Sequence, residues 1–105
     1  MNKKITITGM CVSPGIVKGI LRFYKKGHVY KKTDIVLLDQ WLTSGVALLK
    51  KAGGLLSSKG GLTCHASIIA REYGIPCLVS VKNFNTIKEG VRLELNATAE
   101  SITLL

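Results

Sequence analysis

The sequence has little of what defines a metal site, a disulfide framework or an exported protein. Its three cysteines, Cys11, Cys64 and Cys77, form no C-x-x-C pair, and no second histidine stands at ligand spacing. Reduced thiols in a cytoplasmic protein fit this pattern better than disulfides or a metal. The apolar runs are far too short to cross a bilayer, and the segment after Lys3 and Lys4 is too broken by threonine, glycine and proline for a signal peptide. We expect a cytoplasmic protein with no membrane partner and no bound metal.

The common nucleotide and hydrolase motifs are also missing. There is no G-x-x-x-x-G-K-[ST] P-loop and no G-x-G-x-x-G after a strand, so the chain shows no nucleotide cradle and we expect no cofactor bound by the chain itself. No serine nucleophile stands with a second histidine and a carboxylate, and Cys64 is directly adjacent to His65, which disfavours an in-line thiolate–imidazolium pair. Conventional hydrolase chemistry is therefore disfavoured.

Length and charge describe a small basic domain. The 105 residues, 47% of them hydrophobic, predict a single domain over residues 1–105. A net charge of +9 predicts attraction to phosphate-bearing ligands, acidic protein surfaces or nucleic acid. No nucleic-acid motif surrounds the aromatic residues Phe23, Tyr24 and Tyr30, so these are predicted to be core or strand residues, and no nucleic-acid partner is expected.

Alternation, apolar runs and turn residues predict a mixed α/β chain. Helices are expected over 41–52 and over about ten residues from Thr63, and a charged loop over 25–32 carries His28 as a surface histidine. Within the second helix, Ala66, Ile69, Ala70 and Tyr73 should share the buried face. Strands are expected at 4–8 (ended by Gly9), 19–24, 35–38, 55–56, 77–81, 91–95 and 101–105.

The segment GGLTCHASIIAREYGIP, residues 60–76, is the most informative part of the chain. Thr63 can cap a helix with its hydroxyl, and Gly74 followed by Pro76 supplies the end of that helix. His65 then falls in the first turn, where free backbone N–H groups and the positive end of the helix dipole favour a phosphate. The segment therefore predicts phosphate chemistry at His65.

A histidine in this setting can be a nucleophile toward phosphorus. The helix end disfavours the imidazolium, which keeps His65 neutral, and it stabilises a phosphoryl group once attached. Gly60 and Gly61 leave room for a donor, and Thr63 can hydrogen-bond the ring or a phosphoryl oxygen. Arg71, about two turns along, can reach a partner or form a structural ion pair. The alternative for His65 is a structural hydrogen bond.

The segment GGLTCHASIIAREYGIPCLVSV closely resembles the signature of the phosphohistidine, or mobile swivelling, domain of phosphoenolpyruvate-utilising enzymes. SPGIVKG resembles the entry segment of such domains, and TDIVLLDQW resembles the strand leading to their first helix. The Thr63, Cys64, His65 triplet looks most like the phosphoenolpyruvate synthase branch, with pyruvate phosphate dikinases close by.

The resemblance implies an α/β fold, a swivelling β/β/α domain with mixed sheet layers and two main helices. It implies that His65 is transiently phosphorylated, and that ATP-grasp and TIM-barrel domains or subunits supply ATP, magnesium and pyruvate or phosphoenolpyruvate. The chain would then be a phosphotransferase component that is not competent alone. Gly60, Gly61 and Arg71 match family positions, and Thr63 matches a threonine that is a regulatory phosphorylation target in some dikinases.

The chain departs from the family pattern at a few positions. Lys59 stands where many members carry an acidic residue, Ser80 replaces a common glycine after the next strand, and Asn96 replaces a frequent aspartate. The alternative interpretation is a non-catalytic binding or regulatory module with the swivelling fold. A nucleic-acid binder driven by the charge is a further alternative.

Overall fold

The computed structural model describes residues 3–4, 8–25, 27–39, 46–59, 65–83 and 87–105. Within these ranges the chain forms eight strands, one 3₁₀-helix and one α-helix. In chain order these are β1 (Lys3–Lys4), β2 (Thr8–Ser13), β3 (Ile16–Phe23), β4 (Asp34–Leu38), the 3₁₀-helix η1 (Val46–Lys51), β5 (Gly54–Ser57), α1 (His65–Tyr73), β6 (Cys77–Lys82), β7 (Arg92–Asn96) and β8 (Ser101–Leu104).

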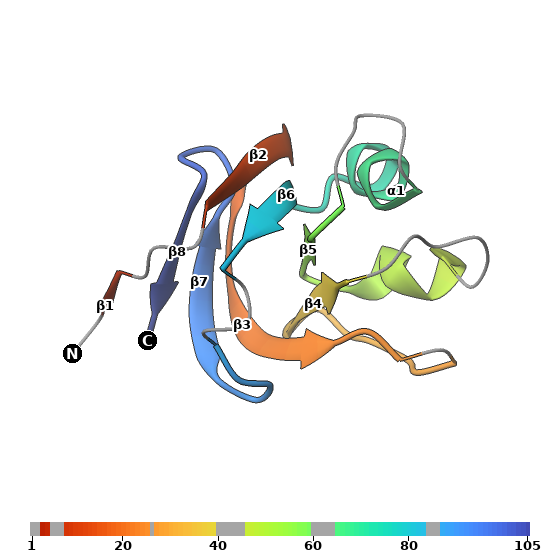
Figure 1. Ribbon diagram of the computed structural model, residues 1–105. Coiled ribbons are helices and arrows are strands. Elements are labelled where there is room, and N and C mark those ends of the chain that lie inside the picture. The colour runs from red at the N-terminus through yellow and green to blue at the C-terminus, as the bar shows by residue number, and fades with distance from the viewer. Residues whose placement is uncertain (1–2, 5–7, 26, 40–45, 60–64, 84–86) are drawn as a thin grey trace.

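All eight strands belong to one mixed sheet with the order β1-β8-β7-β3-β4-β5-β6-β2. The pairs β3/β4, β4/β5 and β5/β6 are parallel, and the other pairs are antiparallel. Two of the parallel connections contain η1 and α1, as parallel neighbours require a crossover. The sheet is strongly curled, so that β3, β7 and β8 form one layer, β4, β5 and β6 a second, and the helices a third (Figure 1). The predicted β/β/α fold class is confirmed, although the described residues contain one main helix, α1, where two were expected.

Two hydrophobic clusters hold these layers together. One lies inside the curl of the sheet and includes Leu21, Leu56, Leu78, Leu93 and Ile102, all fully buried. The other lies between β4–β6 and the helices. Both are possible because β4 and β5 are buried on both faces, and all nine of their residues are buried. The parallel strands are therefore the centre of the domain.

The strand predictions beyond Thr8 are largely confirmed, and Pro14 and Gly15 lie between β2 and β3. The strand expected to end at Gly9 is the exception. β2 passes through Gly9 and continues to Ser13. A Cβ on residue 9 would lie 3.0 Å from both the Val79 carbonyl oxygen and the Val81 Cγ2 on the neighbouring strand. Glycine is present here because β6 approaches closely, and it does not mark a turn.

The two predicted helices differ in outcome. α1 is an α-helix of nine residues, whereas within 41–52 the described part, residues 46–52, is the 3₁₀-helix η1 and the residue after it. The Ala52 N–H donates to the Leu49 carbonyl, an i→i+3 bond of the 3₁₀ type. The next residue, Gly53, donates to the Asp34 carbonyl at the start of β4, and a Cβ there would meet the Lys32 carbonyl. The chain after η1 therefore lies in close contact with the start of β4. This contact favours the tighter 3₁₀ turn at the end of the segment.

The buried face of α1 was predicted correctly at three of four positions. Ala66, Ile69 and Ala70 are buried in the cluster under the helix, whereas Tyr73 is 49% exposed. Tyr73 precedes the point where the chain leaves the helix. Gly74 has φ +66°, and the Ile75 N–H donates to the Ala70 carbonyl, a 6→1 bond typical of the Schellman motif. The helix therefore ends at Tyr73, and the side chain of this last helical residue is half exposed.

No helix in the described ranges is long and apolar enough to span a membrane.

Candidate functional site

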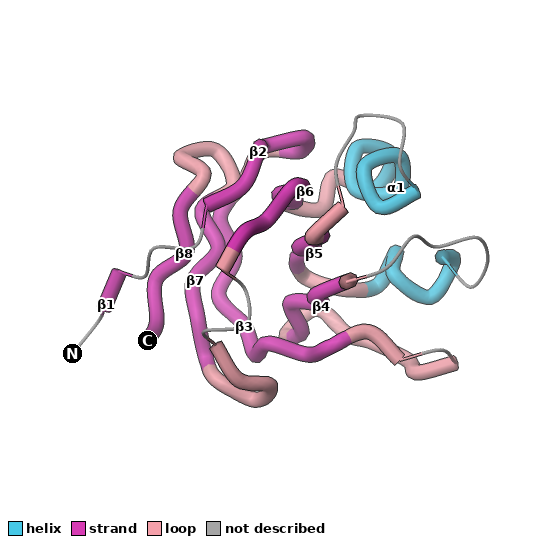
Figure 2. The backbone as a smooth tube through the Cα atoms, viewed as in Figure 1, coloured by secondary structure: helices cyan, strands magenta, loops and turns pink. Residues whose placement is uncertain are grey.

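The candidate site lies where β5 connects to α1. The strands β4, β5 and β6 are parallel, so their carboxyl ends share one edge of the sheet. α1 follows β5 and precedes β6, and it must therefore start at that edge and run back toward the beginning of β6 (Figure 2). His65 is the first residue of α1, which confirms its predicted place in the first turn of the helix. Ligands of α/β sheets commonly bind at this edge.

The chain entering the site is held on both sides. After β5, the Ser58 N–H donates to the Leu38 carbonyl of β4, and the Ser58 hydroxyl donates to the Asp39 carboxylate. The Ser80 N–H of β6 donates to the Lys59 carbonyl at 2.9 Å. Ser58 is thus fixed to β4, and Lys59, the residue immediately before the glycine pair, is fixed to β6. The loop that precedes His65 therefore starts from a rigid base.

The helix behind the site is equally fixed. Ala66 and Ile69 pack into the cluster under α1, and Ser67 is fully buried. The Ser13 hydroxyl of β2 donates to the Ala70 carbonyl at 3.3 Å, which joins α1 to the edge of the sheet. The first turn of α1 contains no acidic residue, so no carboxylate of the helix itself offsets the positive end of its dipole. This helix end attracts anions.

The remaining candidate residues have different outcomes. Gly60, Gly61, Thr63, Cys64 and the side chain of His65 lie outside the described residues, so the Thr63 cap and the role of the glycines stay predictions. Arg71 lies on the exposed side of α1, in its last turn. Its two predicted roles stay open.

The structure explains the surroundings of two residues, Ser80 and Asn96, that depart from the family pattern. Ser80 has φ +55°, a conformation that favours glycine, and it is the residue that bonds the Lys59 carbonyl. The common glycine at this position in the resembled domains fits that backbone. Asn96 accepts a hydrogen bond from the Ala99 N–H in the β7–β8 turn, a bond that an aspartate can also accept.

The described residues hold no group of three or more histidine, cysteine, aspartate or glutamate side chains that could bind a metal ion. Cys11 and Cys77 lie on the neighbouring strands β2 and β6, Cys11 partly exposed and Cys77 buried.

Sequence comparison identifies the family. Residues 30–100 match the family described as "PEP-utilising enzyme, mobile domain", a region that contains the whole candidate site. The chain belongs to this family. It is 34% identical over 85 residues to a probable phosphoenolpyruvate synthase of Methanothermobacter thermautotrophicus, which covers 78% of this chain and 12% of that protein. It is also 34% identical over 95 residues to a rifampicin phosphotransferase of Bacillus subtilis, covering 88% of this chain and 11% of that one.

The mobile domain therefore spans about a tenth of the length of these curated relatives. Among solved structures, aconitase X of Thermococcus kodakaraensis has a similar fold, with a TM-score of 0.71, 17% identity, and coverage of 94% of this chain and 97% of that one. At such low identity the similarity concerns the fold alone, and it shows that the fold is not confined to phosphotransferases.

One further group of residues comes together only in the structure. The sequence predicts a charged loop over 25–32 with His28 on its surface, and His28 is indeed exposed. In the structure this loop folds back against β3 and β4 and lines a cavity together with Glu89, which is distant in sequence. No local pattern could have indicated that contact, because it depends on the pairing of β3 with β4 and β7.

Proposed function

We propose that residues 1–105 form one phosphoryl-carrier domain in which His65 accepts a phosphoryl group at one active site and delivers it at another. The two sites would lie on ATP-grasp and TIM-barrel domains or subunits, which would hold ATP, magnesium ions and pyruvate or phosphoenolpyruvate. The chain itself would be the phosphotransferase component that carries the group and would act in the cytoplasm, where these substrates are found. It would bind no cofactor and no nucleic acid.

The proposed chemistry uses the imidazole of His65 as nucleophile and leaving group. A neutral ring nitrogen attacks phosphorus, a P–N bond forms and the P–O bond to the donor breaks, with the electron pair leaving on the donor oxygen. For phosphoenolpyruvate the leaving group is the enolate of pyruvate, which takes up a proton. The reverse steps return the group, so His65 is unchanged after a full cycle.

The start of α1 would assist both states of the histidine. Its backbone N–H groups and dipole disfavour the imidazolium and stabilise the phosphoryl dianion. The absence of any acidic residue in the first turn of α1 leaves this field unopposed by the helix itself. Thr63 would hydrogen-bond the ring or a phosphoryl oxygen, and Gly60 and Gly61 would leave space for the phosphoryl donor. Cys64 would be the small residue between Thr63 and His65.

The observation that carries the proposal is the family match over residues 30–100, which includes His65 as the first residue of α1. Support also comes from relatives that are named phosphoenolpyruvate synthase and rifampicin phosphotransferase, because the first name gives a phosphate ester as product and the second names phosphoryl transfer. The net charge of +9 suits docking on acidic clefts that hold phosphate donors, through steering that salt should weaken.

The test is intact mass at alkaline pH after incubation with a host extract plus phosphoenolpyruvate, or plus ATP and magnesium. The sequence contains only two histidines, so His28→Ala is a matched control for His65→Ala. We expect one acid-labile phosphoryl adduct on the wild type and on His28→Ala, and none on His65→Ala. The donor that produces the adduct indicates which partner domain delivers the group.

Retention of the adduct by a folded His65→Ala variant contradicts the assignment of the histidine. Absence of any adduct, from an extract shown to charge another mobile domain, favours the alternative of a binding module that keeps the fold without phosphoryl transfer.

A further inference from the structure

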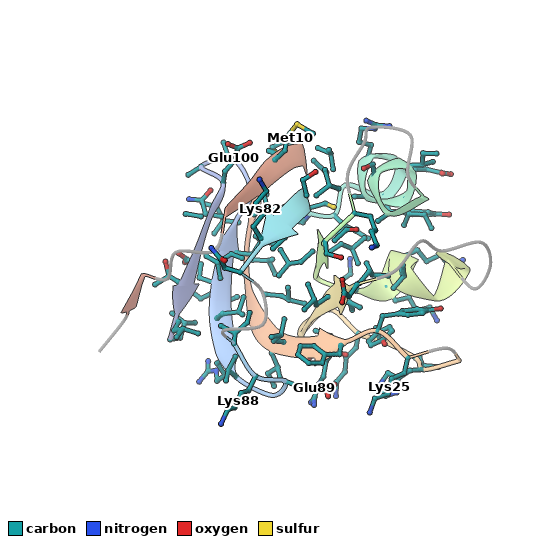
Figure 3. All side chains as sticks on the ribbon, in the orientation of Figure 1. Met10, Lys25, Lys82, Lys88, Glu89 and Glu100 are labelled. Carbon is teal, nitrogen blue, oxygen red and sulfur yellow. The ribbon has the colours of Figure 1, made fainter. Side chains whose placement is uncertain are left out.

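A second candidate site lies in the loop that connects β3 to β4, of which the structure describes residues 24–25 and 27–33. The loop, the start of β4 and the turn before β7 surround a cavity of about 690 Å³. Lys25 and Glu89, at two sides of this region, lie at the lower edge of the molecule in Figure 3, away from α1 in Figure 1. The cavity is therefore separate from the candidate phosphohistidine site.

The loop is folded back by a buried tyrosine. The Tyr30 hydroxyl donates to the Phe23 carbonyl at 3.3 Å and accepts from the Lys25 N–H at 2.9 Å. The His28 N–H closes a turn by donating to the Lys25 carbonyl at 3.1 Å. Because these bonds hold both sides of the loop, the cavity exists before any ligand arrives, which lowers the entropic cost of binding.

The two carboxylates of the cavity are already engaged. Asp34 accepts from the Lys31 N–H at 3.1 Å through Oδ2, and its Oδ1 lies 3.5 Å from Nε of Arg22. Glu89 accepts from the Phe23 N–H at 3.1 Å. Both carboxylates therefore accept backbone hydrogen bonds and Asp34 balances the charge of Arg22, while Glu89 remains a negative charge on the cavity wall.

The cations that remain are Lys25 and Lys31. Both are exposed, and within the described ranges neither ammonium group has a hydrogen bond or an ion pair. They belong to the two sides of the same loop, and both line the cavity. Two unpaired ammonium groups on one rigid cavity attract an anion more strongly than dispersed surface lysines do.

The cavity also offers flat and apolar surface. The rings of His28 and Tyr30 are 4.7 Å apart at 50°, and His28 is exposed. Phe23 and Val29 line the same cavity and are 37% and 66% exposed, which is unusual for large apolar side chains unless something covers them. A purely inorganic anion would leave these groups unused.

We propose that this cavity binds a small organic phosphate whose flat apolar part lies on His28 and Val29 while its phosphate group contacts Lys25 and Lys31. The site is independent of His65 and of the phosphoryl-carrier function, and the ligand is held there without a chemical step.

Phenyl phosphate is a suitable probe, followed by amide chemical shifts of the ¹⁵N-labelled protein at constant ionic strength. We expect shifts at Lys25, Tyr30 and Lys31, with weaker binding of inorganic phosphate, which lacks the ring, and of phenol, which lacks the charge. The double variant Lys25→Ala/Lys31→Ala should weaken phenyl phosphate binding about threefold to tenfold, as expected for two exposed charge contacts.

The control for net charge is Lys50→Ala/Lys51→Ala, which removes two exposed lysines from η1. This variant should bind phenyl phosphate as the wild type does. Equal weakening in the two double variants would reduce the effect to the overall positive charge and overturn the proposal. Absence of shifts around the cavity, or equal binding of inorganic phosphate, would overturn it as well. None of these results depends on whether His65 is phosphorylated.

Discussion

At the scale of single residues, Tyr30 is the side chain on which the β3–β4 loop most depends. Replacement by Phe keeps the buried ring but removes both hydrogen bonds of the hydroxyl and leaves the Lys25 N–H without its acceptor. We expect a loss of about 1–2 kcal/mol in the free energy of unfolding, measured with urea. Tyr24→Phe is the matched control, because the Tyr24 hydroxyl bonds to none of the described residues and its loss should cost less than ~0.5 kcal/mol. Equal losses in the two variants would contradict this role.

The same pair of proteins gives a second, pH-dependent measurement. Burial, followed by the nearby charges of Tyr24, Glu89 and Asp34, raises the pKa of Tyr30 above its ordinary value of 10.0, although the bond from Lys25 opposes this. The unfolded chain then loses the phenolic proton at a lower pH than the folded chain. Stability from Tyr30 is therefore complete below pH 10 and falls as the pH rises toward the folded pKa. The stability difference between wild type and Tyr30→Phe should shrink above pH 10, and a constant difference would contradict the shift.

Predictions of burial for single residues were correct where the type of side chain decides its burial. They were wrong where burial depends on the position of the residue within its strand or helix. Tyr30 was expected in the core or a strand, and it is buried. Phe23 received the same expectation and is a strand residue, but it is 37% exposed because it ends β3 beside the cavity. Tyr73 follows the helical period of the buried face, but it is the last residue of α1 and is 49% exposed. Periodicity gives the direction of a side chain around a helix, and it does not say how far along the helix the packing continues.

At the scale of elements, β6 contains an irregularity next to the candidate site. Thr8 pairs with Lys82 and Met10 with Val79, so two steps along β2 correspond to three along β6. The extra residue creates a β-bulge opposite Gly9, and within it Ser80 has a positive φ. The bulge turns the Ser80 N–H to the Lys59 carbonyl, and this bond is part of the base of the His65 loop.

Because a side chain at positive φ is strained, Ser80→Gly should stabilise the domain. We expect a gain of about 0.5–1 kcal/mol in the free energy of unfolding, the released strain being partly offset by the greater freedom of glycine in the unfolded chain. Ser101→Gly in the regular strand β8 is the control, and it should lose about 0.5–1 kcal/mol. Urea unfolding of the three proteins measures both changes. A loss at both positions would show that the serine side chain contributes more than its backbone costs.

Sequence patterns predicted most elements because their signals are local. Apolar runs bounded by turn residues located β4, β5 and β6, and the glycine after Tyr73 located the end of α1. They gave the wrong role to Gly9. A side chain is absent there because β6, about seventy residues further along the chain, approaches closely. They also gave an α-helix where the described residues form η1, because the close contact of Gly53 with β4 is not visible in the local sequence. The first turn of α1 was predicted for the same reason that the strands were, from adjacent residues.

At the scale of the whole molecule, the order of the strands could not be derived from periodicity, and the family resemblance implied only the β/β/α layers. β1 and β8, at the two ends of the chain, are paired, and β2 joins β6 rather than β3. The parallel pairing of β4, β5 and β6 brings their carboxyl ends together at the start of α1, and the pairing of β3 with β4 and β7 encloses the cavity at the β3–β4 loop. Both candidate sites therefore depend on pairing between strands that are distant in sequence, although each strand is predictable from its local sequence.

The curl of the sheet also brings its edge strand β2 and the following turn beside the β7–β8 turn. The Cys11 N–H of β2 donates to the Glu100 carboxylate at 2.8 Å, the Gly15 N–H donates to the Thr98 hydroxyl at 3.0 Å, and the Ala97 N–H donates to the Gly15 carbonyl at 2.9 Å. Glu100 and the β2 strand that carries Met10 lie together at the top of Figure 3. The carboxylate occupies an edge N–H that would otherwise be open to another strand.

Removing the Glu100 carboxylate should break the hydrogen bond to the Cys11 N–H and leave the two hydrogen bonds of Gly15 in place. In Glu100→Ala, we expect faster hydrogen exchange at the Cys11 amide, because its acceptor is lost, and unchanged exchange at Gly15, whose acceptor is Thr98. Glu100→Gln keeps an acceptor oxygen and should lie between the wild type and the alanine variant. All three side chains carry the same strain at φ +56°, so the comparison isolates the hydrogen bond. Unchanged protection of Cys11 in Glu100→Ala would mean that solvent already competes for this amide, whereas equal loss at Cys11 and Gly15 would mean that the two turns separate as one unit.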